Sequence, residues 1–85
     1  MNKHFPLLPN IEYLIDGNGE ITIGSVGQIH CAATAADNDQ CLAMLVRRDS
    51  ETFEQLLMRL DRAIEMAAED ETFIDEINNG PDDRI

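Results

Sequence analysis

The chain has 85 residues, and its 17 acidic side chains against six Lys and Arg give a formal net charge of −11 and a pI near 4.2. Apolar residues make up 44% of the chain, which favours one folded domain and leaves too little material for two separate cores. The negative charge excludes binding to nucleic acid or to an anionic membrane by charge, and no apolar run reaches the roughly 18 residues of a transmembrane helix.

Residues 1–10 contain two prolines and show no hydrophobic period, so we expect an extended N-terminal arm. The β-branched and aromatic segment 11–15 predicts a first strand, and the alternating segment 20–23 predicts a second. Segment 16–19, with the sequence DGNG, lies between them and is typical of a hairpin turn, because glycine and asparagine adopt positive φ at low cost.

Two more strands are predicted after a Gly-rich break at 24–27. Segment 28–36 alternates between polar and apolar residues, and an Asp-Asn-Asp turn at 37–39 leads into a strand over 40–48. This last strand is apolar on both faces, which is typical of a central strand or of one that a partner covers on its second side.

A long amphipathic helix of about five turns is predicted to begin at Ser50, a residue that accepts hydrogen bonds from the first turn. Glu51 adds negative charge where the helix dipole favours it, but a capping box on Ser50 is excluded because Phe53 holds the third position. The apolar positions that define the buried face are Phe53, Leu56, Leu57, Leu60, Ile64, Ala67 and Ala68.

The C-terminal segment 72–78 predicts a short second helix with Phe73, Ile74 and Ile77 inward, and a strand over 72–74 is the alternative. Residues 79–85 are expected to form a flexible tail. The sequence therefore predicts one α+β domain over 11–78. We expect a four-stranded antiparallel sheet of two hairpins, followed by a long amphipathic helix packed on one face and a short C-terminal helix.

Metal and cofactor chemistry has little support. His4, His30, Cys31 and Cys41 lack the paired spacing of a zinc site, and we expect the two thiols to be small buried side chains. Segment 16–21 resembles the middle of an EF-hand loop, but apolar Leu14 and neutral Ser25 would hold the positions of its first and last acidic ligands. We therefore expect no metal and no cofactor.

Catalytic chemistry has equally little support. His30 and Cys31 are neighbours on a predicted strand, so their side chains point to opposite faces and do not form a nucleophile and its base. The chain contains no G-x-S-x-G motif, phosphate-binding loop or dinucleotide fingerprint. We therefore expect no enzymatic activity.

The acidic residues are concentrated in the helical half of the chain. Residues 50–85 hold eleven acids and three bases, a net of −8, whereas residues 1–49 hold six acids and three bases, a net of −3. Glu65 and Glu69 form a like-charged pair, and Glu69 and Asp70 lie where the helix dipole disfavours negative charge, so local stability does not select them. Either they keep a small protein soluble, or they form a surface for a basic partner.

Two methionines extend this surface, since Met58 and Met66 lie on the side of the helix away from its apolar face. A methionine adapts to a partner surface, although a widened core would explain the same pattern. The candidate partner-binding residues are therefore Glu65, Glu69, Asp70, Glu71, Asp75, Glu76, Met58 and Met66.

Segments 49–57 and 62–64 form an acidic helix directly after predicted strands, and this segment loosely resembles the strand-to-helix segment of HicB-type antitoxins. The aromatic–Pro–Gly strand that precedes the helix in that family has no counterpart before this helix. The resemblance implies an antitoxin-like or accessory protein that neutralises a toxin through its sheet edge.

The size, acidity and lack of catalytic motifs are also similar to those of small phage or mobile-element inhibitors, including DNA mimics and anti-CRISPR proteins. We therefore expect a cytoplasmic, non-enzymatic protein-binding module, in its sharpest form an inhibitor that mimics nucleic-acid charge against a basic target. A homodimer is expected because a chain this small has a thin core, and a structural homodimer is a further alternative function.

Overall fold

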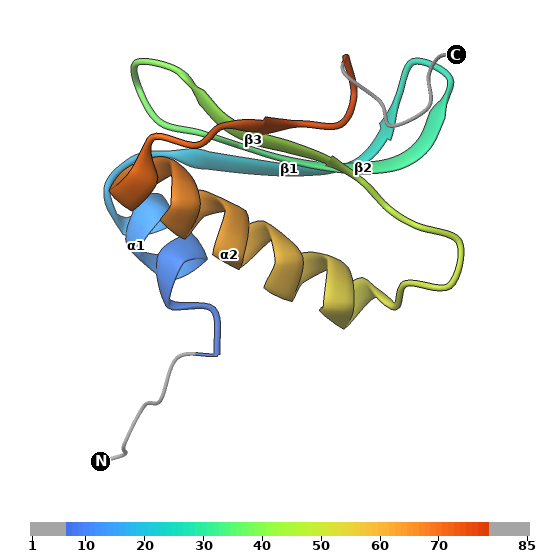
Figure 1. Ribbon diagram of the computed structural model, residues 1–85, viewed down its shortest axis with the longest axis horizontal. Helices are drawn as coiled ribbons and strands as arrows, with labels where there is room; N and C mark the ends of the chain where they lie inside the picture. Colours follow the sequence, from blue (N-terminus) through green and yellow to red (C-terminus); the bar gives the residue numbers. More distant parts are fainter. Residues whose placement is uncertain (1–6, 79–85) are drawn as a thin grey trace.

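The structure is a computed structural model, and it describes residues 7–78. In chain order the elements are α1 (Pro9–Asp16), β1 (Glu20–Val26), β2 (Ile29–Ala36), β3 (Cys41–Val46), α2 (Phe53–Asp70) and β4 (Ile74–Asp75). Both helices lie on one face of a single four-stranded sheet, so the molecule has two layers (Figure 1). The predicted α+β class is confirmed, whereas residues 1–6 of the predicted arm and the predicted tail at 79–85 lie outside the described residues.

The sheet is mixed, so the prediction of a wholly antiparallel sheet of two hairpins is wrong. Its order is β1-β2-β3-β4, with antiparallel pairing up to β3 and parallel pairing between β3 and β4. After β3 the chain crosses through α2, and Ile74 then pairs with Ala43. A strand that follows such a crossover returns parallel to its neighbour.

The predicted short helix at 72–78 is also wrong, and β4 takes its place. Ile74 packs against the core, and the Glu76 N–H donates to the Met44 carbonyl oxygen at 2.7 Å. Asp75 then closes a turn, because its Oδ1 accepts from the N–H groups of Ile77 and Asn78 at 3.1 and 2.9 Å. Backbone pairing and this turn use the groups that a helix would need for its own hydrogen bonds.

Segment 11–15 belongs to helix α1, so the prediction of a first strand there is wrong. Pro9 occupies the first turn, where its fixed φ suits a helix and its missing N–H costs nothing. Leu8 at the N-cap gives no side-chain hydrogen bond, and Asp61 of α2 supplies the acceptor in its place. The apolar composition fits a strand equally well, and this distant partner favours the helix.

The DGNG segment ends α1 instead of closing a hairpin. Asn18 adopts φ 72° and donates its N–H to the Ile15 carbonyl oxygen at 3.1 Å, and the Gly19 N–H donates to the Leu14 carbonyl oxygen at 2.8 Å. These two bonds are those of a Schellman motif, which satisfies the last carbonyl groups of a helix. A Cβ atom at Gly19 would lie 2.5 Å from Leu14 Cδ1, so only glycine fits there.

The three strands predicted at 20–23, 28–36 and 40–48 are present as β1, β2 and β3. The β1–β2 pair carries a register shift between Gly24 and Val26, where the sequence shows its Gly-rich break. Cys41 lies opposite Ala36, and both cysteines are free thiols. Cys41 is exposed and Cys31 is half-buried, so the prediction of buried thiols is wrong.

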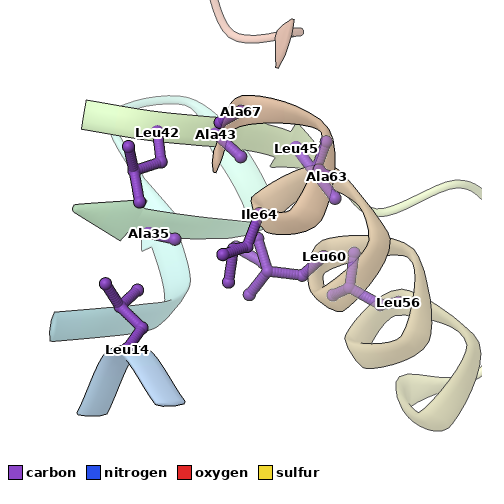
Figure 2. Packing of buried hydrophobic residues seen from close by; sticks show 11 residues of the cluster. Leu14, Ala35, Leu42, Ala43, Leu45, Leu56, Leu60, Ala63, Ile64 and Ala67 are labelled. Atoms are coloured by element: carbon purple, nitrogen blue, oxygen red, sulfur yellow. The ribbon is translucent and has the colours of Figure 1, made fainter. Parts of the chain in front are cut away.

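The core lies between the helices and the facing side of the sheet (Figure 2). Ala33, Ala35 and Ala43 are at most 1% exposed, and their small side chains let α2 approach the strands closely. Among residues that the sequence places on the apolar face of α2, Phe53 at the helix start is 48% exposed. The buried residues of α2 are Leu56, Leu60, Asp61, Ala63, Ile64 and Ala67.

The start of α2 differs from the prediction by two residues. Thr52 is the N-cap, and its Oγ1 accepts from the Gln55 N–H at 3.0 Å while Gln55 Oε1 accepts from the Thr52 N–H at 2.9 Å. The prediction of a cap at Ser50 is therefore wrong, because a complete capping box forms at Thr52. The helix of about five turns that the pattern predicts is confirmed as Phe53–Asp70.

Candidate acidic site

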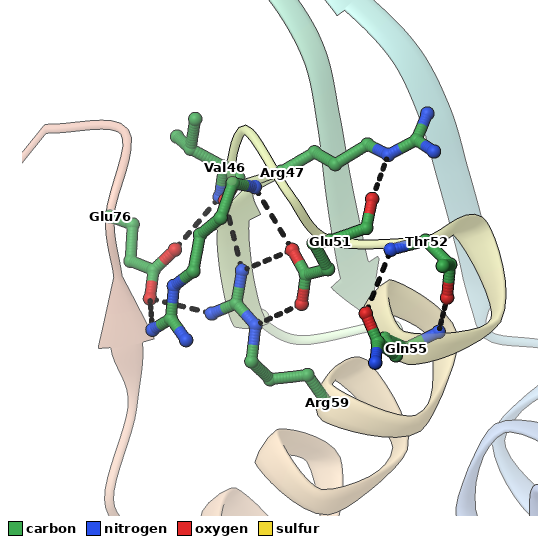
Figure 3. A network of polar contacts seen from close by, with 8 residues as sticks. Val46, Arg47, Glu51, Thr52, Gln55, Arg59 and Glu76 are labelled. Carbon is green, nitrogen blue, oxygen red and sulfur yellow. Dashed lines mark hydrogen bonds and ion pairs between the residues drawn. The ribbon is translucent and has the colours of Figure 1, made fainter.

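The arginines of the described chain are concentrated around one network. Arg59 donates from Nε to Glu51 Oε2 at 2.7 Å and from Nη1 to Glu76 Oε2 at 2.8 Å (Figure 3). Its Nη2 donates to the Val46 carbonyl oxygen at 2.9 Å and to Glu51 Oε1 at 3.1 Å. The network therefore joins α2 to the end of β3, to the β3–α2 loop and to the segment after β4.

Electrostatics within this network keep both partners charged. The side-chain hydrogen bonds from Arg59 lower the pKa of Glu51 from 4.5 to about 2, although burial opposes the shift. The Arg48 N–H also donates to Glu51 Oε1, at 3.0 Å. The hydrogen bonds that Arg59 donates to Glu51 in turn raise the pKa of Arg59. We call the residues Arg47, Arg48, Glu51, Arg59 and Glu76 the arginine end.

Two of the predicted partner-binding carboxylates are bonded within the protein. Glu76 Oε1 accepts from the Val46 N–H at 2.9 Å, and its other oxygen accepts from Arg59. Asp75 accepts from Ile77 and from both the backbone and the side chain of Asn78, and the hydrogen bonds from Asn78 lower its pKa. These bonds hold β4 and the turn after it, which gives both carboxylates a structural role.

The remaining predicted residues lie on the outer side of α2 and at its C-terminal end. Met58 is 62% exposed, and Glu65 and Glu69 follow it on the same side of the helix. Glu65 Oε1 lies 3.9 Å from Arg62 Nε in an exposed ion pair. Met66 is half-buried, so the two methionines do not form one exposed surface.

Asp70 and Glu71 lie at the other end of the molecule from the β3–α2 loop (Figure 1). Glu71 ends α2 in the left-handed conformation at φ 56°, and its N–H and that of Thr72 both donate to the Met66 carbonyl oxygen. A glutamate is uncommon at such a φ, where glycine is the usual residue. The end of α2 therefore presents two exposed carboxylates on a strained backbone.

A cleft of about 600 Å³ opens beside Glu71. Its lining comes from α1 and the glycine after it, the β2–β3 turn and the start of β3, the C-terminal part of α2, and the segment before β4. The apolar part of the lining consists of Leu14, Leu42, Ile64, Ala67 and Ala68. The remaining residues that line it are Asn10, Tyr13, Asp16, Gly17, Asp37, Gln40, Glu71 and Phe73.

Charge and aromatic groups give this cleft its chemical character. Three acidic residues, Asp16, Asp37 and Glu71, belong to the lining, and among residues 7–78 no Lys, Arg or His does. Tyr13 and Phe73 also belong to the lining, and these residues are 82% and 46% exposed. We call this site the acidic cleft, and we call it together with Asp70 the acidic end.

Of the residues at the acidic end, the sequence predicts Asp70 and Glu71 as partner-binding residues, and it makes no such prediction for Asp16, Asp37, Tyr13 or Phe73. The sequence predicts turns at Asp16 and Asp37, and it predicts that Phe73 points inward from a short helix. Tertiary packing brings these residues together from four separate segments, and the local pattern of the sequence carries no signal for it. The excess of acids is the one signal that pointed to this region.

A second cleft, of about 440 Å³, lies at the arginine end. His30, Cys31, Arg47 and Arg48 line it together with Asp49 and Glu51. Within residues 7–78 no group of three or more His, Cys, Asp or Glu side chains is placed to hold a metal ion. The acidic cleft, by contrast, presents the carboxylates and aromatic rings that bind an organic cation.

No helix within residues 7–78 combines the length and the apolar character needed to cross a membrane. No protein-family model matches the chain, and no curated protein and no solved structure matches it either.

Proposed function

We propose that this protein is a non-enzymatic module that binds another protein, and that its acidic end contacts a basic surface of that partner. The separation of charge within the fold carries this proposal. Arg59 is bonded to Glu51 and Glu76 at the arginine end, whereas three acidic residues line the acidic cleft and no cationic residue of the described chain does. A cleft lined by one sign of charge attracts a partner of the opposite sign.

The position of Asp70 and Glu71 supports a role beyond solubility. Both lie at the C-terminal end of α2, where the helix dipole disfavours negative charge. Glu71 also holds a left-handed conformation that costs a non-glycine residue about 1 kcal/mol. An exposed carboxylate elsewhere would add the same solubility without these costs, so its place here favours a role in binding.

In its sharpest form the proposal is an inhibitor that mimics the charge of nucleic acid. Glu65 and Glu69 lie one turn apart on α2 and lead along the helix toward Asp70 and Glu71. These carboxylates present repeated negative charge over the last turns of α2, as phosphates do along a strand of nucleic acid. A basic nucleic-acid-binding surface is the partner that these carboxylates fit.

A labelled octa-arginine peptide tests whether the acidic end is the contact. The variant Asp16→Lys/Asp70→Lys reverses two exposed charges there, and Asp49→Lys/Glu54→Lys makes the same change of net charge near the arginine end. We expect the first pair to weaken binding at least tenfold more than the second at about 0.1 M salt. The difference should vanish near 1 M, where the Debye length falls to about 3 Å. Equal loss in both variants would show that net charge alone binds the peptide.

The edge of the sheet supports a second candidate function, neutralisation of a toxin or pairing with a second copy. β1 is the outer strand of the sheet, and within residues 7–78 it pairs only with β2. An unpaired edge offers its backbone groups to a strand of another chain. Thr22→Pro would remove one donor from β1, so loss of a partner or of a dimer in this variant alone would favour the edge over the acidic end.

A further inference from the structure

We infer that the acidic cleft binds an arginine side chain presented by a partner protein. The inference rests on the proposed function and names the group that the contact recognises. The cleft combines an apolar base with three acidic residues and two solvent-exposed aromatic residues, and its lining within residues 7–78 includes no cation. Each of these three features matches one part of an arginine side chain.

The apolar base matches the methylene stem. Leu42 and Ile64 are 7% and 4% exposed, and they line the cleft together with Leu14 and two alanines of α2. Long cationic side chains bury their stems on apolar surface while the charged group stays in a polar environment. A metal ion or a short ammonium compound would leave this apolar surface uncovered.

The carboxylates match the guanidinium group. Asp16, Asp37 and Glu71 come from three separate segments of the chain, and all three line the cleft. Asp37 is held in place because its Oδ1 accepts from the N–H groups of Asp39 and Gln40 at 2.7 and 2.8 Å. A guanidinium carries five donors in a planar fork and can bond to several carboxylates at once.

The rings favour arginine over lysine. Tyr13 and Phe73 both line the cleft and are open to solvent. A guanidinium plane stacks on aromatic faces and is more weakly hydrated than an ammonium group, so it loses less on leaving water. The cleft is also larger than one side chain, which leaves room for the residues on either side of the arginine in the partner.

Short peptides test the inference on the full chain. The probe is acetyl-Gly-Arg-Gly-amide, and its controls carry citrulline, norleucine or lysine in place of arginine. Citrulline keeps the shape of arginine without its charge, and norleucine keeps only an apolar stem. Tyr13 is the one tyrosine of a chain without tryptophan, so tyrosine fluorescence reports from the cleft itself. Amide shifts in NMR spectra at Gly17, Gln40 and Glu71 give an independent location.

We expect saturable shifts at these amides with the arginine peptide and binding at least tenfold weaker with citrulline and norleucine. Lysine should bind more weakly than arginine. Asp16→Asn/Glu71→Gln should abolish the shifts, whereas the control Asp49→Asn/Glu54→Gln, at two exposed positions outside the acidic end, should keep them. Tyr13→Ala should weaken binding without unfolding the protein, because this side chain is 82% exposed.

Three results would overturn the inference: no saturable shift, equal binding of citrulline or lysine, or shifts located outside the cleft. If the charge reversals at the acidic end still weaken octa-arginine binding more than the matched pair, the proposed function survives and only the arginine cleft is rejected. If both experiments fail, the acidic end is not a contact surface.

Discussion

Asp61 of α2 caps the N-terminus of α1, although Asn10 and Asp61 are 51 positions apart in the chain. Its Oδ1 accepts from the N–H groups of Asn10 and Ile11, each at 2.8 Å, and its Oδ2 accepts from Asn10 Nδ2 at 3.0 Å. The first N–H groups of a helix have no partner within it, and a carboxylate also suits the positive end of the dipole. Asp61 is only 8% exposed, so these three hydrogen bonds also satisfy a polar side chain that is buried.

Asp61→Ala should lower the free energy of unfolding by about 1–3 kcal/mol, because two backbone donors near the core would lose their acceptor. Asp61→Asn should lose less stability, because its remaining oxygen can still accept from both N–H groups. Its amide nitrogen would then face the Asn10 side-chain amide, which is itself a donor. Urea midpoints give the size of the effect, and hydrogen exchange at α1 gives its location. Arg62→Ala is the control on the exposed neighbour, and equal losses in Asp61→Ala and Arg62→Ala would contradict the role of Asp61.

Thr52→Ala should cost about 0.5–2 kcal/mol, because the Gln55 N–H would lose its side-chain acceptor at the start of α2. Ser50→Ala should leave the denaturant midpoint unchanged, since Ser50 lies two residues before the N-cap and is exposed. The two variants remove similar hydroxyl groups from neighbouring positions. If Ser50→Ala loses as much stability as Thr52→Ala or more, the assignment of Thr52 as the N-cap is contradicted.

Glu51 should make the fold sensitive to acid. Its pKa is about 2 in the folded protein against an ordinary 4.5, so the deprotonated form is favoured by folding. The stability that it contributes is present above about pH 4.5 and is lost as the pH falls toward about 2. Glu51→Gln should lower the free energy of unfolding by about 1–3 kcal/mol at pH 7. As the pH falls from about 4.5 to about 2, this variant should lose less stability than the wild type. If the free energy of unfolding changes with pH in the same way for the wild type and for Glu51→Gln, this role of Glu51 is contradicted.

Glu71→Gly should raise the free energy of unfolding by about 1 kcal/mol, because glycine adopts the left-handed conformation without strain. Glu69→Gly is the matched control within the helix, and it should lower the stability by about 1 kcal/mol. If Glu71 serves binding, Glu71→Gly should also weaken the interaction with octa-arginine. A variant that is more stable and binds equally well would show that Glu71 has no share in binding.

The sequence predicts the long helix and three of the strands well, because their apolar periods are long and their partners adjoin them in the chain. Segment 11–15 is a case in which the local sequence predicts the wrong element. Its composition fits a strand, and the residue that favours a helix is Asp61, which follows half a chain later. Ile74 is the same kind of case, because β4 exists through its pairing with Ala43 across the sheet.

The candidate site was predictable only in part. Net charge points to the C-terminal half of the chain, and Asp70 and Glu71 lie at the end of α2, where Glu71 lines the cleft. Glu76 looked equally acidic in the sequence, but its hydrogen bonds to Val46 and Arg59 give it a structural role. Whether a carboxylate is open to a partner depends on which cations fold against it, and that depends on tertiary contacts.

Native co-purification with three forms of the protein tests most directly whether the acidic end binds a basic partner. The forms are the wild type, Asp16→Lys/Asp70→Lys, and the matched control Asp49→Lys/Glu54→Lys, each checked for folding by circular dichroism. We predict that a partner with a basic surface is retained by the wild type and by the matched control, and is lost from Asp16→Lys/Asp70→Lys. Retention of the same partner by all three forms, or its equal loss from both variants, would contradict the account.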